Sequence, residues 1–223
     1  MTFLLDPYAA RSCPVKTFNA FDPGTPKPEK PLDESLLEAF SGGSEFRESM
    51  LEALCRADDV VDLHDEGHNP AETLAAMETG APVIVGGCLP VDVTGHRTGC
   101  PDALVRGDDR PGGRPGYWPL RVKPYRLLEK QHNAKELRAS AIGSPTTLEP
   151  LPGFRFRSYR QGVLLELAHH WRLLQACGRA ATTPVAGVIG FDDHRRGMIV
   201  WVPLELRFLR TFSRTSANGY RLR

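Results

Sequence analysis

Residues 98–107 read TGCPDALVRG and residues 117–126 read YWPLRVKPYR. Each has a short apolar run bounded by glycine or proline, which is typical of a strand next to a turn. The DDRPGGRPG between them indicates a turn or flexible loop. The pair therefore predicts two successive strands with polar ends, Asp102 on the first and Arg121 and Lys123 on the second.

Apolar residues at helical spacing predict helices on both sides of this strand pair. Ser44 and Asn69 are candidate N-caps, because their side chains can accept a hydrogen bond from the first turn of a helix. The strongest helical pattern is RQGVLLELAHHWRLLQACG, about five turns long. The predicted helices span residues 33–40, 45–57, 69–80 and 160–178.

Short apolar runs predict further strands, and the order of elements predicts an α/β fold with a mixed sheet. Pro119 suggests an edge position or a bulge for its strand, because proline has no N–H to donate. Residues 131–155 are polar, and we expect them to be irregular. The further strands are predicted at residues 81–87, 185–193 and 196–204, the last two as a hairpin around 194–196.

The segment FDPGTPKPEKPL at residues 21–32 has four prolines and one glycine, so it predicts a loop or an extended arm. We therefore expect an N-terminal arm with a proline-rich loop over residues 1–43, and one α/β domain over residues 44–223. The chain of 223 residues is long enough for a substantial core.

The composition is that of an ordinary soluble protein, with 41% hydrophobic and 25% charged residues. No apolar run approaches the roughly 18 residues of a membrane span, so no membrane partner is expected. The start, MTFLLDPYAARSCP, does not have the pattern of a secretory signal. These features predict a cytoplasmic protein.

The five cysteines lie at positions 13, 55, 88, 100 and 177, with long spacings and no C-x-x-C pair. A disulfide framework is not expected in a cytoplasmic chain. Buried free thiols are the main expectation, and a four-cysteine iron–sulfur site is the alternative.

The net charge of +1 hides an asymmetry between the two halves of the chain. Residues 1–120 carry 10 basic and 20 acidic side chains, net −10, whereas residues 121–223 carry 18 and 7, net +11. The later half therefore suits an anionic partner. The alternative is that the two halves attract each other within one fold.

Asp102 and Lys123 suggest the chemistry of phosphodiester hydrolysis. That reaction needs a divalent metal to neutralise the phosphate and activate water, and Mg²⁺ prefers oxygen ligands. A nearby lysine stabilises the developing negative charge. Asp102 would then bind Mg²⁺ or Mn²⁺ and Lys123 would act electrostatically. The alternative is that Asp102 is a turn residue after Pro101 and Lys123 a solvated strand end.

The chain resembles the RecB-family predicted nucleases of the PD-(D/E)xK superfamily, especially the large actinobacterial type. The resembling segments, in the family's order, are LDPYAARSCPVKTFNAFDP, AAMETGAPVIVGGCLP, GHRTGCPDALVRG, GYWPLRVKPYRLLE, LLELAHHWRLLQA and TFSRTSANGYRLR. The family's PD motif falls on Pro101-Asp102 and its acid-x-Lys motif on Arg121-Val122-Lys123. The resemblance implies a restriction-endonuclease-like core and a Mg²⁺- or Mn²⁺-dependent DNA nuclease of DNA repair.

The chain departs from this family's pattern at the second acid. Arg121 replaces an Asp or Glu, and a guanidinium cannot ligate Mg²⁺. Glu166 and His170 stand where the family's helix has Gln and Tyr. In some branches the helix supplies the second acid, so Glu166 is an expected metal ligand. Glu72, on the predicted helix at residues 69–80 before the first strand, is another expected metal ligand.

Both acids also have plainer explanations. Glu166 is the only acid of the long helix and has no basic residue at ideal helical spacing, but it could still be an ordinary surface residue. Glu72 could be an exposed first-turn acid favoured by the helix dipole.

Basic and aromatic residues alternate in GFRFRSYR at residues 153–160. Such alternation suits a track for single-stranded nucleic acid, although a strand with one buried aromatic face and external arginines gives the same pattern. The expected nucleic-acid contacts are Arg155, Arg157 and Arg160 of this stretch, with Arg121 and His170 from the candidate site. The expected partner is DNA, single-stranded or with free ends.

Two functions follow from this pattern. The first is a metal-dependent DNA nuclease with Asp102, Lys123 and Glu166 as catalytic residues. The second is a nuclease-fold module that Arg121 has impaired and that binds nucleic acid without cleaving it. The chain ends in ANGYRLR, whereas family members are usually longer. We therefore expect either a fragment or a truncated member that lacks a C-terminal domain or a partner protein.

Overall fold

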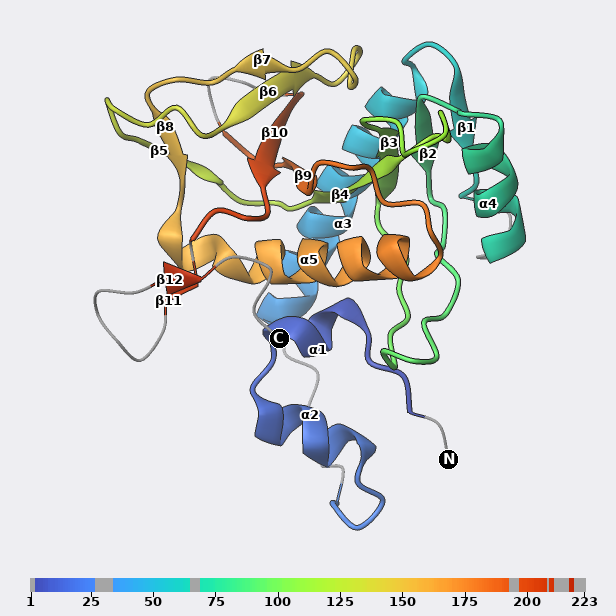
Figure 1. Ribbon diagram of the computed structural model, residues 1–223. Coiled ribbons are helices and arrows are strands. Elements are labelled where there is room, and N and C mark those ends of the chain that lie inside the picture. The colour runs from blue at the N-terminus through green and yellow to red at the C-terminus, as the bar shows by residue number, and fades with distance from the viewer. Residues whose placement is uncertain are drawn as a thin grey trace.

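The helices and strands of the chain are arranged around one central sheet (Figure 1). The computed structural model describes residues 3–26, 34–64, 69–192, 197–207, 209–210 and 217–218. The helices are α1 (Pro7–Arg11), α2 (Pro14–Phe21), α3 (Glu34–Cys55), α4 (Pro70–Glu78) and α5 (Gln161–Ala176), with a 3₁₀ turn η1 (Ser158–Arg160). The strands are β1 (Val60–Asp62), β2 (Val83–Val85), β3 (Ala103–Arg106), β4 (Tyr117–Val122), β5 (Leu128–Lys130), β6 (Arg138–Ala141), β7 (Glu149–Pro150), β8 (Phe154–Phe156), β9 (Val185–Ile189), β10 (Met198–Pro203), β11 (Leu209–Arg210) and β12 (Ala217–Asn218).

The central sheet has eight strands in the order β1-β2-β3-β4-β9-β10-β6-β7. The strands β1 and β2 are parallel, as are β4 and β9, and the other neighbours are antiparallel. Two small sheets pair β5 with β8 and β11 with β12. The predicted α/β fold with a mixed sheet is confirmed.

The two stretches that predict successive strands pair with each other as β3 and β4, with Ala103 opposite Leu120. The strand β4 also pairs with β9, where Leu120 lies opposite Gly187. Because β4 is therefore central, the edge position expected from Pro119 is wrong. The sheet tolerates the proline because the pairs with β9 begin only at Leu120, one residue beyond it.

The remaining strand predictions are partly confirmed. The strand β2 lies within 81–87, and β9 and β10 form the predicted antiparallel hairpin, whose turn at 194–196 lies outside the described residues. Residues 131–155 are not irregular throughout, because they contain β6, β7 and part of β8. These strands have only two to four residues, too few for periodicity to identify.

The helix α3 replaces the two helices predicted at 33–40 and 45–57. Gly42 and Gly43 weaken a helix without breaking it, and α3 packs on β1 and β2 with Leu51 and Leu54 buried. The domain boundary expected after residue 43 thus falls inside a helix. Within the described residues, no helix has the length and apolar character needed to cross a bilayer.

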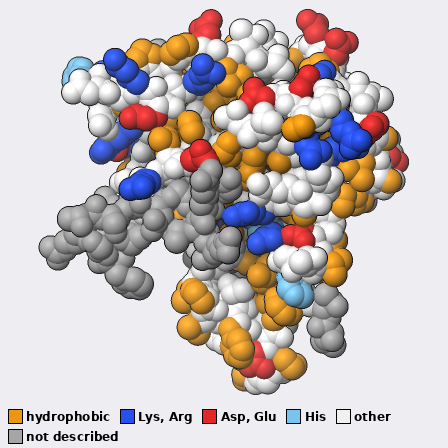
Figure 2. Space-filling model, viewed as in Figure 1, with side chains coloured by type: hydrophobic (Ala, Val, Ile, Leu, Met, Phe, Trp, Pro, Cys, Tyr) orange, Lys and Arg blue, Asp and Glu red, His pale blue; other side chains and the backbone are white. Residues whose placement is uncertain are grey.

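The other helices lie around the sheet (Figure 1). The helix α5 packs on β4 and β9, α4 packs on β2, and α1 packs on α5 from the side away from the sheet. The helix α2 extends from this body, and hydrophobic side chains such as Val15 and Phe18 are exposed on it (Figure 2).

Two of the five cysteines form a disulfide, Cys88–Cys100, so the expectation of free thiols is wrong for this pair. The segment after β2 runs beside the segment before β3, with the Leu89 N–H donating to the Gly99 carbonyl at 3.3 Å. This pairing brings the two Cα atoms to 4.2 Å, close enough for a disulfide. Cys13, Cys55 and Cys177 are free.

Tyr117 links β4 to the end of α4. Its ring is completely buried, and its hydroxyl donates to the Ala81 carbonyl at 2.9 Å, with the Met77 carbonyl at 3.3 Å. Burial raises the pKa of Tyr117 to about 12, so the hydroxyl remains a donor at neutral pH.

We expect the Tyr117→Phe substitution to lower the free energy of unfolding by about 1–2 kcal/mol, because it leaves a buried carbonyl without its donor. Urea denaturation followed by circular dichroism measures this change. Tyr8→Phe, at an exposed ring, is the matched control and should change stability by less than about 0.5 kcal/mol. Equal stability of Tyr117→Phe and the wild type would contradict the role of this hydroxyl.

Candidate ion-pair site

Asp102 lies directly before β3 and is almost completely buried. Its backbone N–H donates to the Leu120 carbonyl at 3.0 Å, and its Oδ2 accepts from the Val122 N–H at 2.7 Å. Its Oδ1 accepts from Arg47 Nε at 2.7 Å and from Arg121 Nη1 at 3.3 Å. The pairing of β3 with β4 therefore fixes this carboxylate, and two guanidinium groups neutralise it.

Glu166 is the buried acid of α5, which packs on β4. Lys123 follows β4 directly and donates from Nζ to Glu166 Oε2 at 2.7 Å. Arg11 forms an ion pair with Oε1 at 2.8 Å, and Arg121 Nε lies 3.5 Å from Oε2. Burial lowers the pKa of Lys123, and the hydrogen bond to Glu166 opposes this shift.

Arg121 joins the two acids, because one guanidinium contacts both Asp102 and Glu166. Its Nη1 also donates to the Cys100 carbonyl at 3.3 Å, which anchors it to the segment before β3. The three residues predicted as catalytic, Asp102, Lys123 and Glu166, are thus brought together. We call the group of Asp102, Glu166, Arg11, Arg47, Arg121 and Lys123 the ion-pair cluster.

Sequence reasoning missed two members of the ion-pair cluster, Arg11 and Arg47. Arg11 comes from α1, and its guanidinium also lies over the Tyr8 ring, 4.8 Å from the centroid. Arg47 comes from α3, 55 residues before its partner Asp102. The sequence held one signal for Arg11, its place in the stretch LDPYAARSCPVKTFNAFDP, and none for Arg47.

His170 is completely buried beside the ion-pair cluster, and neither ring nitrogen has a hydrogen-bond partner in the described part of the chain. In this conformation it is out of reach of the nucleic acid it was expected to contact. Its neighbour His169 points elsewhere and contacts the Thr98 carbonyl at 3.0 Å. Gly99 allows the close approach, since a Cβ there would lie 3.1 Å from the His170 ring and 2.9 Å from Pro7.

The ion-pair cluster does not fit Mg²⁺ in this arrangement. The ion would need several oxygen ligands in near-octahedral geometry, whereas both carboxylates already face protein cations and Arg121 contacts both. The other predicted ligand, Glu72, stays on α4 and accepts from the Asn69 side chain at 3.1 Å. Among the residues the structure describes, no group of three or more His, Cys, Asp or Glu side chains could hold a metal ion.

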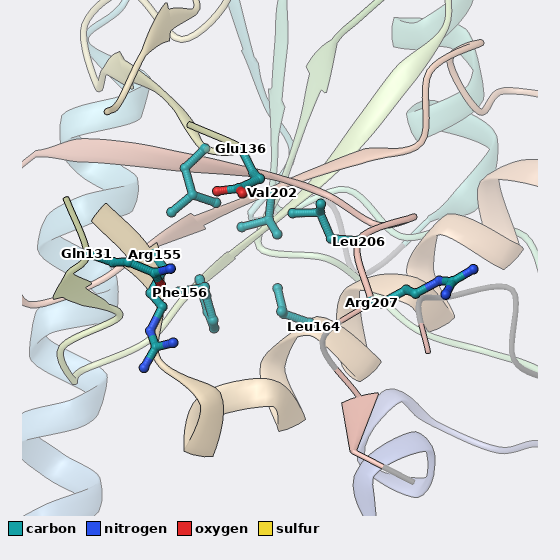
Figure 3. Close-up of a pocket in the computed structure, with 9 residues that line it drawn as sticks. Gln131, Glu136, Arg155, Phe156, Leu164, Val202, Leu206 and Arg207 are labelled. Atoms are coloured by element: carbon teal, nitrogen blue, oxygen red, sulfur yellow. The ribbon is translucent and has the colours of Figure 1, made fainter. Parts of the chain in front are cut away.

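The alternating stretch at 154–160 divides into two parts. Arg155 is on β8, where its Nε donates to Glu129 at 2.6 Å. Phe156 of β8 and Leu164 of α5 line the apolar side of a cavity of about 220 Å³. The Arg155 guanidinium points away from this cavity (Figure 3). This part matches the pattern of a half-buried aromatic face with an external arginine.

Arg157 and Arg160 are surrounded by aromatic rings. Arg160 lies over the Tyr125 ring, 3.9 Å from its centroid, and 5.2 Å from that of Tyr159. Arg157 donates to the Leu128 carbonyl and contacts the Tyr159 hydroxyl. Burial is the largest cause that raises the pKa of Tyr125, and the nearby charge of Glu166 is the next. Arg160 therefore lies between Tyr159 and a ring, Tyr125, that is close to an acid of the ion-pair cluster.

Comparisons with known proteins identify no relative. No protein-family model, no curated protein and no solved structure matches the chain. Support for a function therefore comes from the geometry of the ion-pair cluster and its surroundings.

Stability should fall in mild acid because of His170. Burial, with the nearby charges of Arg121, His169 and Lys123, lowers the pKa of His170 well below 6.5. Below about pH 6.5 the unfolded chain binds a proton on this ring that the folded chain does not, so acid favours unfolding. Each such group contributes about 1.4 kcal/mol per pH unit.

We expect the free energy of unfolding, measured by urea titration between about pH 7 and pH 5, to fall less steeply in His170→Asn than in the wild type. His132→Asn removes an exposed histidine and should leave the wild-type slope unchanged. The same slope in His170→Asn and the wild type would show that His170 takes up a proton in the folded state.

Proposed function

We propose that this chain binds single-stranded DNA through the ion-pair cluster, on a restriction-endonuclease-like core of the RecB-nuclease type, and does not cleave it. The observation that carries the proposal is the position of Arg121. Its guanidinium lies 3.3 Å from an Asp102 oxygen and 3.5 Å from a Glu166 oxygen. A positive group of the protein thus neutralises the two carboxylates that a nuclease of this type would use for its metal.

The charge of the ion-pair cluster supports phosphate binding. Four cations surround two carboxylates, so two positive charges remain without an acid among the described residues. The closest contacts of Arg11 and Arg47 with the carboxylates are through Nε. Their Nη groups carry four of the five N–H donors of an arginine, and no hydrogen bond from them is found in the described part of the chain. These groups can donate to phosphate oxygens in the paired, charge-assisted geometry that arginine favours.

The aromatic group beside the ion-pair cluster supports a single strand as the partner. The Tyr159 ring is mostly exposed and lies near the Arg157 and Arg160 guanidinium groups. Unpaired bases stack on exposed aromatic rings and arginine planes, whereas bases inside a duplex are not available for stacking. A strand with one phosphate at the ion-pair cluster could place a neighbouring base on Tyr159.

A metal-dependent nuclease is the second candidate, and the convergence of Asp102, Lys123 and Glu166 from β3, β4 and α5 favours it. This function requires Arg121 to leave the two carboxylates when metal and DNA bind. The loss of its contacts with two buried acids opposes that movement. We therefore rank binding without cleavage first.

Incubation of the full chain with labelled single-stranded DNA and Mg²⁺ or Mn²⁺ separates the two functions. We expect binding that weakens as salt rises, with a less steep salt dependence in Arg47→Gln, because each lost phosphate contact lowers the slope by about 0.7. Arg138→Gln, on β6 three strands from β4 in the sheet, is the matched control.

The same incubation tests cleavage. We expect the wild type to form no more cleaved DNA than the Asp102→Asn variant does. Metal-dependent products that Asp102→Asn and Lys123→Ala both abolish would establish the nuclease instead.

The Arg121→Asp substitution, which puts an acid at the position where this nuclease family has one, is a second test of the role of Arg121. In Arg121→Asp a third carboxylate replaces the guanidinium, so we expect this variant to bind Mn²⁺ in calorimetry at concentrations where the wild type shows no specific binding. Arg138→Asp makes the same change of charge on β6 and should not gain a site. Specific Mn²⁺ binding by the wild type that Asp102→Asn removes would contradict the proposed block.

A further inference from the structure

We infer that the ion-pair cluster recognises a phosphate monoester, the group at the end of a nucleic-acid strand, in preference to the phosphodiesters within it. This inference rests on the proposed function and names the part of the strand that the site takes. It follows from the charge of the ion-pair cluster, from the graded exposure of its cations and from the donors that remain on them.

The charge of the ion-pair cluster matches a monoester better than a diester. Asp102 and Glu166 neutralise two of the four cations, and two positive charges remain. His170 adds no third charge at neutral pH, because burial lowers its pKa well below 6.5. A phosphate monoester carries a charge of about −1.5 to −2 at pH 7, whereas an internal phosphodiester carries one negative charge.

The cations of the ion-pair cluster differ in exposure. The side chains of Arg11 and Arg47 are 42% and 43% exposed, that of Arg121 is 22% exposed and that of Lys123 is 13% exposed. A terminal phosphate has a sugar on one side only, so it can approach the less exposed Arg121 and Lys123 more closely than an internal phosphodiester, which has a sugar on both sides.

Unused donors remain on the more exposed and on the less exposed cations. Within the described residues, no hydrogen bond is found for the Nη groups of Arg11 and Arg47, although the Arg11 guanidinium also lies over the Tyr8 ring. Among the same residues, the less exposed Arg121 has its Nε buried without a hydrogen bond, because its 3.5 Å approach to Glu166 is an ion pair of poor hydrogen-bond geometry. A monoester offers three strong acceptor oxygens, enough to engage donors from more than one of these side chains.

The two carboxylates do not prevent anion binding. Asp102 is almost completely buried and receives one backbone and two guanidinium hydrogen bonds. Glu166 is held from both sides by Arg11 and Lys123. Both acids thus face cations, and the donors that remain on those cations are the groups an incoming phosphate can meet.

Fluorescence anisotropy with three short single strands of one sequence tests the inference on the full chain. One strand carries a 5′-phosphate, one carries a 3′-phosphate and one has hydroxyl groups at both ends. We expect at least one phosphorylated strand to bind about tenfold more tightly than the hydroxyl strand at equal salt. In a separate arm, potassium phosphate should raise the melting temperature of the wild type more than that of Arg47→Gln, because the general stabilising effect of phosphate on folded proteins is common to both.

Variants connect any preference to the ion-pair cluster. In Arg11→Gln and Arg47→Gln the ratio of affinities between phosphorylated and hydroxyl strands should fall toward one. Both side chains are half-exposed, and circular dichroism verifies that each variant folds. Arg138→Gln should keep the wild-type ratio. A preference that survives in both cluster variants would place the phosphate elsewhere and overturn the inference.

The remaining outcomes separate the inference from the proposed function. Equal, salt-sensitive binding of all three strands would overturn the monoester preference and leave the proposed function standing. A stabilisation by inorganic phosphate that Arg47→Gln reduces, without any preference among the strands, would assign the site to free phosphate and overturn the strand end as its ligand. No binding to any strand and no stabilisation by phosphate that Arg47→Gln reduces would overturn both.

Discussion

The electrostatic compensation of two buried carboxylates, Asp102 and Glu166, is the constraint on which the rest of this structure depends. An ion removed from water is costly unless charged partners and hydrogen bonds replace its hydration. The protein meets this need by bringing Arg11 from α1, Arg47 from α3 and two cations from β4 and its end to one place. The ion-pair cluster thereby ties the N-terminal helices to the sheet and to α5.

The same compensation determines what the site can bind. Arg121 contacts both acids, and its hydrogen bond to the Cys100 carbonyl places it beside the Cys88–Cys100 disulfide. With a guanidinium held there, both carboxylates face cations of the protein. Among the described residues of the ion-pair cluster the cations outnumber the acids, and aromatic rings lie near Arg160. This charge balance is the basis on which we propose phosphate binding without metal-dependent cleavage.

Local patterns predicted the centre of this arrangement, because β3, β4, α5 and the hairpin of β9 and β10 are long or apolar enough to identify. They could not predict contacts that depend on how distant elements pack: Arg47 lies 55 residues from Asp102 in the sequence, and Cys88 meets Cys100 only because two loops run side by side. Pro119 misled because a missing N–H describes one residue, whereas a strand's place in a sheet depends on its neighbours.

Anomalous X-ray scattering from crystals grown with Mn²⁺ tests whether Arg121 blocks a metal site, because it locates the metal and the Arg121 side chain together. We expect the Arg121 guanidinium to contact both Asp102 and Glu166 and no anomalous peak to lie between these carboxylates. An anomalous peak coordinated by both carboxylates, with the Arg121 side chain turned away, would contradict this expectation.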